Sequence, residues 1–174
     1  MDSIFFYRNP DGAASGDGPL AKLNIAIQPN LSVAGWPVDA GSRALANFTA
    51  LENATIVDRL SRSGAFLCGS TKMSEFGFGL AQSHAGEAVK QTIAGAELVL
   101  DMTGEARLAA AAADVCGFKP SYGLVSHFGL IGLIPSMEAC GVLSPSIQNI
   151  RGILKAVAGP DEKDFSLPDE GVPD

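Results

Sequence analysis

The stretch from Gly117 to Gly129 constrains the fold more than any other part of the sequence. It reads Gly-Phe-Lys-Pro-Ser-Tyr-Gly-Leu-Val-Ser-His-Phe-Gly. Glycine adopts backbone conformations that other residues avoid, while Pro120 removes an amide donor and biases Lys119 away from the helical region. Apolar side chains alternate with these turn formers, so the stretch is not a solvated loop. It predicts a short buried strand bent through tight turns, which either lines a site or connects core strands.

The composition predicts one globular domain that contacts neither nucleic acid nor a membrane directly. Of the 174 residues, 47% are hydrophobic and 18% are charged, which is enough for a core of useful size. The net charge of -7 disfavours a nucleic-acid backbone or an anionic membrane as a partner. No apolar run approaches the length of a membrane span, and the N-terminus lacks a signal-peptide pattern. Because acidic residues gather at the end, we expect a domain over 1–160 and an acidic tail over 161–174.

The cysteines indicate the cellular compartment. Cys68, Cys116 and Cys140 are odd in number, lie in apolar surroundings and lack C-x-x-C spacing. This pattern favours buried, reduced thiols over a disulfide framework or a metal site. We therefore expect a cytoplasmic protein with no metal and no other cofactor.

Hydrophobic periodicity predicts alternating helices and strands. Apolar runs predict strands at 23–27, 65–68 and 98–100. Helices are predicted at 54–63, 87–94, 107–113 and from Ile147 to the Gly159-Pro160 stop. Asn53 is the expected N-cap of the first helix. A helix followed by glycine and an apolar strand is one half of a layered α/β unit.

Five blocks of the chain resemble the amidase signature family, in the family's order. The Gly69–Phe76 block, Gly-Ser-Thr-Lys-Met-Ser-Glu-Phe, is similar to G-K-T-N-M-D-E-F, and the Gly117–Gly129 stretch is similar to G-[LF]-K-P-[ST]-Y-G-x-V-S-x-[YF]-G. The other blocks lie at 54–65, 134–141 and 158–164. The family includes the glutaminase A subunit of tRNA-dependent amidotransferases. The resemblance implies a layered α/β, amidase-signature-like fold, with a mixed, mostly parallel sheet flanked by helices and reduced in size.

The resemblance also implies where a catalytic site would lie. Members of the family hydrolyse amides with a nucleophilic serine, a middle serine and a basic lysine, and backbone amides hold the oxyanion. Alignment with P-I-A-I-K-D-N places Gln28 at the lysine, and alignment with D-T-G-G-S-I-R places Glu105 at the nucleophile. The middle serine falls at Ser83 or is lost at His84. A glutamine amide cannot take a proton at neutral pH, so the base is replaced.

The same alignment implies the residues that would contact a ligand. Thr103 and Gly104 fall in the backbone that forms the oxyanion hole, where Thr103 replaces a glycine, and Arg107 falls at the family's arginine. The implied ligand is a small amide or carboxylate.

Three functional hypotheses follow. In the first, the chain is a degenerate amidase-signature protein that binds a ligand or a partner without hydrolysing amides. In the second, it is an active amidase or amidotransferase-type subunit with rebuilt chemistry, in which Glu105 acts as a base. In the third, its function lies in assembly, as a homo-oligomer or with an amidase-family partner subunit, through apolar segments such as 130–134. A core strand is the favoured alternative for that segment.

Overall fold

The computed structural model describes residues 4–11, 16–79 and 84–168. The described strands are β1 (Phe5–Arg8), β2 (Asn24–Ile27), β3 (Phe66–Thr71), β4 (Ala96–Asp101), β5 (Cys116–Phe118) and β6 (Ala139–Ser144). The described helices are α1 (Thr55–Arg62), α2 (Glu87–Lys90), α3 (Glu105–Ala113) and α4 (Ile147–Val157), with short 3-10 turns at Arg43–Leu45 and Glu75–Gly77. Ser83 lies outside the described residues.

The strands form one mixed sheet in the order β1-β3-β2-β4-β6-β5. β2 pairs in parallel with both β3 and β4, whereas β1, β6 and β5 join through antiparallel pairings. Four strands, β2 to β5, therefore run in one direction and β1 and β6 run in the other. The sheet is mixed and mostly parallel in strand direction, as the resemblance implied, although three of its five pairings are antiparallel.

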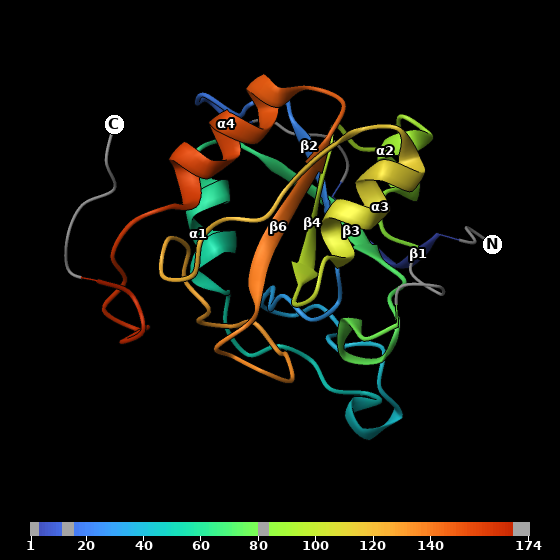
Figure 1. Ribbon diagram of the computed structural model, residues 1–174, viewed down its shortest axis with the longest axis vertical. Helices are drawn as coiled ribbons and strands as arrows, with labels where there is room; N and C mark the ends of the chain where they lie inside the picture. The colour runs from blue at the N-terminus through green and yellow to red at the C-terminus, as the bar shows by residue number, and fades with distance from the viewer. Residues whose placement is uncertain (1–3, 12–15, 80–83, 169–174) are drawn as a thin grey trace.

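Helices cover both faces of the sheet (Figure 1). α1 and α4 lie on one face, where Leu60, Ile150 and Ile153 pack on strand residues such as Ile25 and Leu98. Each of these aliphatic side chains is almost fully buried, and each contributes roughly 1.5–3 kcal/mol of hydrophobic stabilisation. The spacing of Ile150 and Ile153 along α4 is the helical periodicity that the sequence displays.

α3 lies on the opposite face, and small residues allow it to approach the sheet closely. A Cβ atom at Gly141 of β6 would come within 2.6 Å of the Ala106 Cβ, and one at Gly117 of β5 would come within 2.5 Å of the Ala110 Cβ. Alanine on the helix and glycine on the strands therefore make one contact surface. This geometry explains the small residues at Ala106 and Ala110 of α3.

Several local predictions are wrong. The stretch 117–129 turns tightly at Gly123 and Gly129, as expected, with φ near +80°, but it is not a buried strand: only its first two residues belong to β5, and Tyr122 is about half exposed. Residues 130–134 lie in a loop rather than a core strand, and Ile134 is 42% exposed. Apolar side chains are common on protein surfaces, so alternation with turn formers did not establish burial.

Two helix predictions also need correction. Asn53 does not cap α1, because its Oδ1 accepts from the Ala34 amide and its Nδ2 donates to Asp58 Oδ1. Ala54 occupies the N-cap position without a side-chain bond. The expected helix at 87–94 ends at Lys90.

The cysteine prediction holds for two of the three residues. Cys68 and Cys140 are buried and free, and burial raises their pKa values to about 11 and about 12. Cys116 is free but exposed, because it begins the edge strand β5. Within the described ranges, no helix combines the length and apolar character that crossing a membrane requires.

The end of the described chain is held against the domain. Arg59 of α1 donates from Nη1 to the carbonyl oxygens of Val157 and Gly159, at 2.7 and 3.1 Å, and from Nη2 to that of Pro160. Further on, Asp161 accepts from the Ser126 hydroxyl, and Asp164 accepts from the His127 amide at 2.6 Å. Residues 161–164 therefore contact the 126–127 turn instead of extending into solvent.

Candidate functional site

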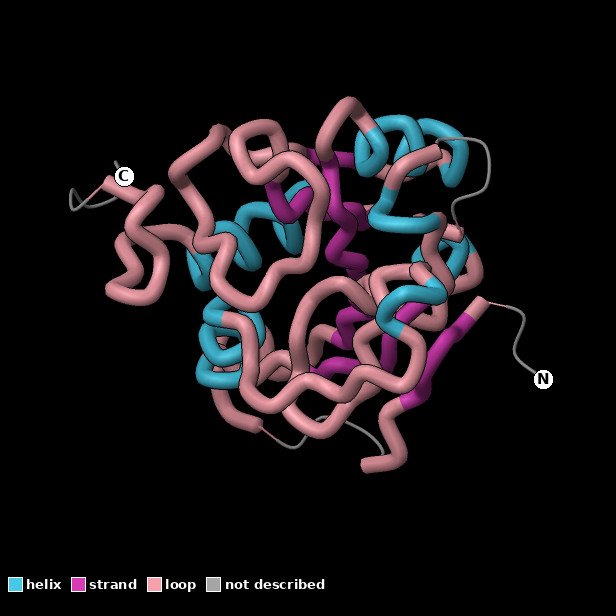
Figure 2. Tube along the Cα trace, turned by 90° about the horizontal axis from the view of Figure 1, so that it is seen from below, coloured by secondary structure: helices cyan, strands magenta, loops and turns pink. Residues whose placement is uncertain are grey.

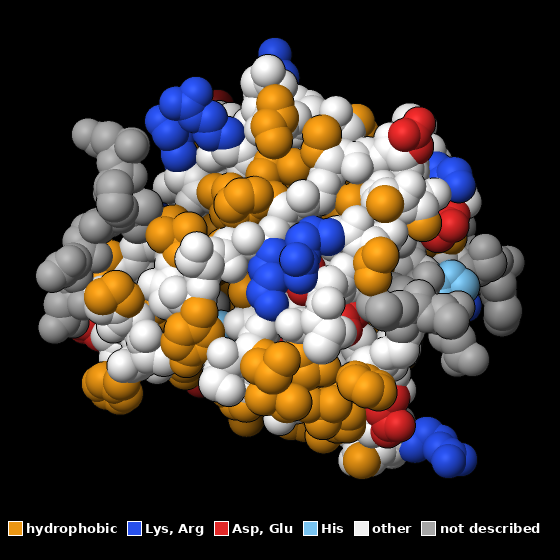
Figure 3. All heavy atoms as spheres, viewed as in Figure 1, with side chains coloured by type: hydrophobic (Ala, Val, Ile, Leu, Met, Phe, Trp, Pro, Cys, Tyr) orange, Lys and Arg blue, Asp and Glu red, His pale blue; other side chains and the backbone are white. Residues whose placement is uncertain are grey.

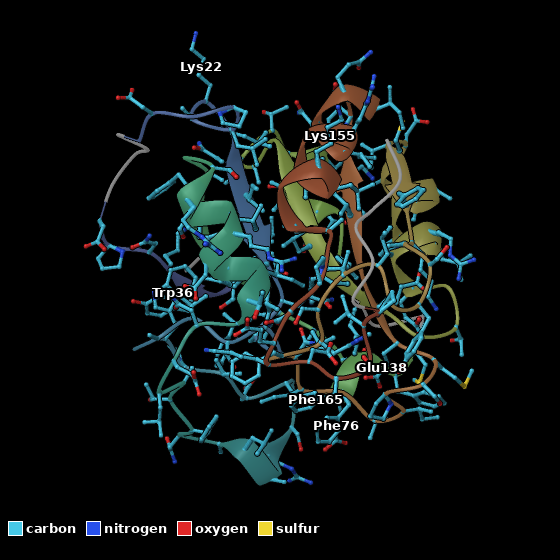
Figure 4. All side chains as sticks on the ribbon, turned by 90° about the vertical axis from the view of Figure 1, so that its left-hand side faces the viewer. Lys22, Trp36, Phe76, Glu138, Lys155 and Phe165 are labelled. Carbon is cyan, nitrogen blue, oxygen red and sulfur yellow. The ribbon has the colours of Figure 1, made fainter. Side chains whose placement is uncertain are left out.

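The candidate site lies at the carboxyl end of β4. Loops spread across this end of the molecule (Figure 2), and Glu138 lies toward it while Lys22, which precedes β2, lies at the opposite end (Figure 4). Parallel strands β2 and β4 both end here. In sheets of this kind, ligands bind beyond the carboxyl ends of the strands.

Gln28 and Glu105 both contact the backbone at this end. Gln28 follows β2 and is 2% exposed, and its Oε1 accepts from the Leu100 amide at 2.9 Å. Glu105 opens α3, and its Oε2 accepts from the Met102 amide at 2.9 Å. The structure therefore brings Gln28 and Glu105, which the resemblance assigned to the base and nucleophile positions, to a three-residue segment, Leu100–Met102.

The Glu105 carboxylate occupies a cradle of backbone amides. Its Oε2 accepts from the amides of Met102, Thr103 and Gly104 at 2.9, 2.7 and 3.0 Å, while its Oε1 accepts from the Thr103 hydroxyl at 2.8 Å. Gly104, with φ near +133°, turns the chain so that these N–H groups converge. The partial positive charge at the start of α3 adds to the attraction. We call these three amides the amide cradle.

These bonds fix the charge of Glu105. Burial alone would raise the pKa of its carboxyl group, but the backbone and hydroxyl bonds from Thr103 and the amide bond from Met102 outweigh burial, so the pKa lies below its ordinary value. A carboxylate that accepts several N–H bonds is stabilised in its charged form. Glu105 is therefore ionised at neutral pH and a weak base.

Charged residues brace the backbone on which the amide cradle is built. The buried Asp101 accepts from Arg107 Nε and Nη2, both at 3.1 Å. Lys119 donates to the carbonyl oxygens of Met102 and Met137, at 3.0 and 2.8 Å, and its Nζ lies 3.7 Å from Asp101 Oδ1. The Asp101 bonds raise the pKa of Arg107 further. On the side of the molecule that Figure 3 shows, Lys and Arg side chains lie near the centre, above a gathering of hydrophobic side chains.

Sequence comparison alone gave Lys119 no role at the site. The one sequence feature that pointed to Lys119 is its place in the Gly-Phe-Lys-Pro motif. Met102, whose carbonyl group it binds, is 17 residues away in the sequence. The resemblance assigned Thr103 and Gly104 to the oxyanion hole, and in the structure both amides donate to Glu105. Arg107 binds Asp101 while its side chain is 52% exposed.

One hollow adjoins the site, and another lies away from it. A cavity of about 120 Å³ adjoins Glu105; it is lined by Ala85, Glu87, Glu105, Leu108, Ala109, Ala112 and Ala113. A wider groove of about 470 Å³ lies beside α1 and Trp36 and includes none of the predicted site residues. Among residues 4–11, 16–79 and 84–168, no three metal-ligating side chains gather.

Comparisons with known proteins define the class to which this fold belongs. The amidase family model matches residues 8–92 and 88–173, so the chain belongs to the amidase family. It is 35% identical to the A subunit of the glutamyl-tRNA(Gln) amidotransferase from Halobacterium salinarum, over 92% of this chain and 43% of that protein.

Solved structures agree on the fold. The crystal structure of the A subunit of the Thermotoga maritima glutamyl-tRNA(Gln) amidotransferase superposes with a TM-score of 0.88 at 23% identity, over 97% of this chain and 42% of that one. The native peptide amidase from Stenotrophomonas maltophilia gives a TM-score of 0.78 at 25% identity, over 88% and 38%. This chain thus spans less than half the length of these relatives.

Proposed function

We propose that this chain is an amidase-family protein that does not hydrolyse amides and acts by binding a small ligand or a partner. The observation that carries the proposal is the Glu105 carboxylate in the amide cradle. Acyl transfer requires free donors for the oxyanion that develops on the substrate. Here a permanent negative charge already occupies those donors, so a substrate oxygen would have to displace a carboxylate that makes four hydrogen bonds.

The base position supports the same proposal. Gln28 accepts the Leu100 amide bond through its amide oxygen, and neither atom of a glutamine amide group takes up a proton at neutral pH. Glu105 itself is a poor substitute, because its lowered pKa departs from the near-neutral value that suits a general base. The alternative of an active amidase with rebuilt chemistry therefore has less support.

The first experiment measures ammonia release from glutamine and from simple primary amides. We expect none from the wild-type protein, and no change in Glu105→Ala, with an active peptide amidase as the positive control. Loss of members of such a triad costs on the order of four to six powers of ten in rate. Turnover that Glu105→Ala abolishes would show that the chemistry has been rebuilt around Glu105.

A second variant tests how much of the ancestral site remains. Gln28→Lys combined with Glu105→Ser restores both replaced residue types, yet we expect no hydrolysis because Thr103 still stands in place of a glycine. Measurable hydrolysis by this double variant would contradict the proposal that the rest of the site has degenerated.

Arg107 is the proposed contact for a carboxylate or amide ligand. Its Nε and Nη2 bind Asp101, while about half of its side chain is exposed, and an arginine can bind two carboxylates from different edges. Acetate, acetamide and glutamine are suitable probes in a ¹H–¹⁵N titration. Shifts near residues 102–107 that disappear in Arg107→Ala would support this contact, and their absence at high ligand concentration would exclude it.

Partner binding is the second proposed function. Leu133, Ile134 and Met137 expose between 42% and 49% of their surface in one loop, and the Halobacterium relative is named as part of a multi-subunit enzyme. Light scattering is expected to give a mass above the 17.9 kDa of one chain; a monomer at high concentration would rule out self-association.

We also propose a cytoplasmic location, because Cys68 and Cys140 are free thiols. Cell fractionation tests this location.

A further inference from the structure

A second buried carboxyl group lies on the same face of the sheet, outside the candidate site. Glu97 sits inside β4 and is fully buried, on the face that α2 and α3 cover. Its neighbours across the sheet are Ala26 of β2 and Leu143 of β6. An acidic side chain in the middle of a central strand is costly unless its oxygens are satisfied or it carries a proton.

Glu97 joins two segments that are distant in sequence. Its Oε1 lies 2.7 Å from the Thr71 hydroxyl at the end of β3, and its Oε2 accepts from the Gly86 amide at 2.7 Å. Gly86 is the N-cap of α2. The carboxyl group thus connects the turn before α2 to the sheet.

The geometry around Thr71 suits a protonated Glu97. Thr71 Oγ1 also lies 3.3 Å from the carbonyl oxygen of Ile27, and its single proton can serve only one of these two acceptors. When Glu97 carries a proton, Oε1 donates to Thr71, Thr71 donates to Ile27, and Oε2 still accepts from Gly86. Every polar group in this chain of bonds is then satisfied.

The turn that Glu97 holds has little room to adjust. A Cβ atom at Gly86 would lie 3.0 Å from the Ala113 Cβ, 3.2 Å from the Ala109 carbonyl oxygen and 3.4 Å from Leu143 Cδ2. Gly86 therefore packs directly between α3 and β6. The four residues of α2 that follow are too few to be stable as an isolated helix, so their position depends on contacts such as this one.

We propose that Glu97 is a proton-controlled latch: neutral Glu97 holds the turn at residues 84–86 and α2 against the sheet, and ionised Glu97 favours their release. Ionisation places a negative charge in the core, where the amide of Gly86 and the hydroxyl of Thr71 are its hydrogen-bond donors among the described residues. Opening the turn lets water reach the carboxylate, which lowers the free energy of the open state.

The surrounding groups determine the direction of the pH effect. Burial raises the pKa of Glu97 to about 7, the bonds from Thr71 and Gly86 oppose the rise, and Glu87 of α2 adds to it. From β3, Cys68 also faces Glu97. Because the folded pKa is raised, the latch is tightest near or below the ordinary value of 4.5. It weakens as pH rises through about 7.

Hydrogen exchange tests the latch directly. After correction for intrinsic exchange, protection of the Gly86 and α2 amides should fall as pH rises from about 5 to 7, on the order of a hundredfold, and then level off. In Glu97→Gln, which keeps one acceptor and one donor in the same shape, protection should stay constant. Glu87→Gln is the matched control and should keep most of the pH dependence.

Two outcomes would overturn the proposal: constant protection in the wild-type protein between pH 5 and 8, or an unchanged pH dependence in Glu97→Gln. Should Glu97→Gln fail to fold, carbon NMR of the Glu97 carboxyl group in the wild-type protein decides. A titration near pH 7, matched by shifts of the α2 amides, supports the latch, and a titration near 4.5 excludes it.

Discussion

Two glutamates near β4 show how differently one fold treats the same functional group. Glu105 follows the end of the strand. Burial raises the pKa of its carboxyl group, but four hydrogen bonds lower that pKa by more than burial raises it, so the group is charged. Glu97 lies inside the strand, and burial raises its pKa to about 7 against two bonds. Both residues are at most 6% exposed. The larger number of donors around Glu105 and the deeper position of the Glu97 carboxyl group in the core together decide which of the two keeps its proton.

The difference also separates two uses of a carboxyl group. In the function proposed above, a charged Glu105 closes a site that hydrolysis would need open, at every pH above its lowered pKa. A Glu97 that titrates near neutrality makes the packing of α2 depend on pH. Substitutions at these two glutamates and at their charged neighbours test this contrast.

The largest expected effect is on the free energy of unfolding of Glu97→Gln. The raised pKa means that wild-type stability is lost as pH rises from 4.5 through about 7, and the variant avoids that loss. At pH 8 it should be more stable than the wild type by as much as about 3 kcal/mol, and at pH 4 nearly equal to it. Urea titrations at the two pH values measure this, and equal differences at both would contradict the assignment.

Glu105→Ala should act in the opposite direction. Removing the carboxylate deprives the amide cradle of its acceptor and should cost about 2 kcal/mol at pH 7. Because the folded pKa is lowered, the stabilisation is present above the ordinary value and is lost as pH falls through the folded one. The same urea titrations, repeated at low pH with Glu105→Gln as the control, should show the deficit shrinking. A deficit that grows on acidification would reverse the comparison.

A smaller effect is expected from Arg107→Ala. Asp101 is buried, but the arginine is half exposed and Lys119 stays within 3.7 Å, so the loss should be about 1 kcal/mol. Thermal unfolding measures the loss, and Arg107→Lys should retain part of the stability. If Arg107→Ala costs more than Glu105→Ala, the ion pair rather than the cradle holds this end of β4.

The smallest effect should come from a carboxylate that has charge without burial. Glu52 lies 3.2 Å from Lys163, and both side chains are more than half exposed. Glu52→Gln should change stability by less than about 0.5 kcal/mol, and added salt should remove even that. A larger loss in urea titration would show that a screened ion pair is worth as much here as a hydrogen-bonded one.

The sequence predicted well those helices and strands that show regular hydrophobic periodicity. Of the apolar residues that repeat along α4, Ile150, Ile153 and Val157 are buried whereas Ile147 is 55% exposed, and the apolar runs located β2, β3 and β4. These elements depend on periodicity, which is local. The tight turns at Gly123 and Gly129 were expected, but the burial of 117–129 was misjudged because nothing in the stretch indicates which of its aromatic side chains meet solvent.

The site was predictable only where an aligned family motif existed. Gln28 and Glu105 were located by alignment, yet the bonds of Glu105 to the three amides depend on how the 102–104 turn folds. Glu97 could not be singled out, because its partners lie 26 and 11 residues away in sequence. Glu97 comes directly before Leu-Val-Leu, so in the sequence it resembles an ordinary solvated residue at the end of a strand.

The clamp of Arg59 on the end of α4 has a consequence for how the chain acquires its structure. Its three bonds join groups 98 to 101 residues apart, so the guanidinium group gains them only after a loop of that length has closed. Such closure is entropically costly and slows folding relative to local contacts. During synthesis, Arg59 can form these bonds only after residues 157–160 have left the ribosome. Until then, the face of the sheet that α4 covers is exposed to chaperones and to aggregation.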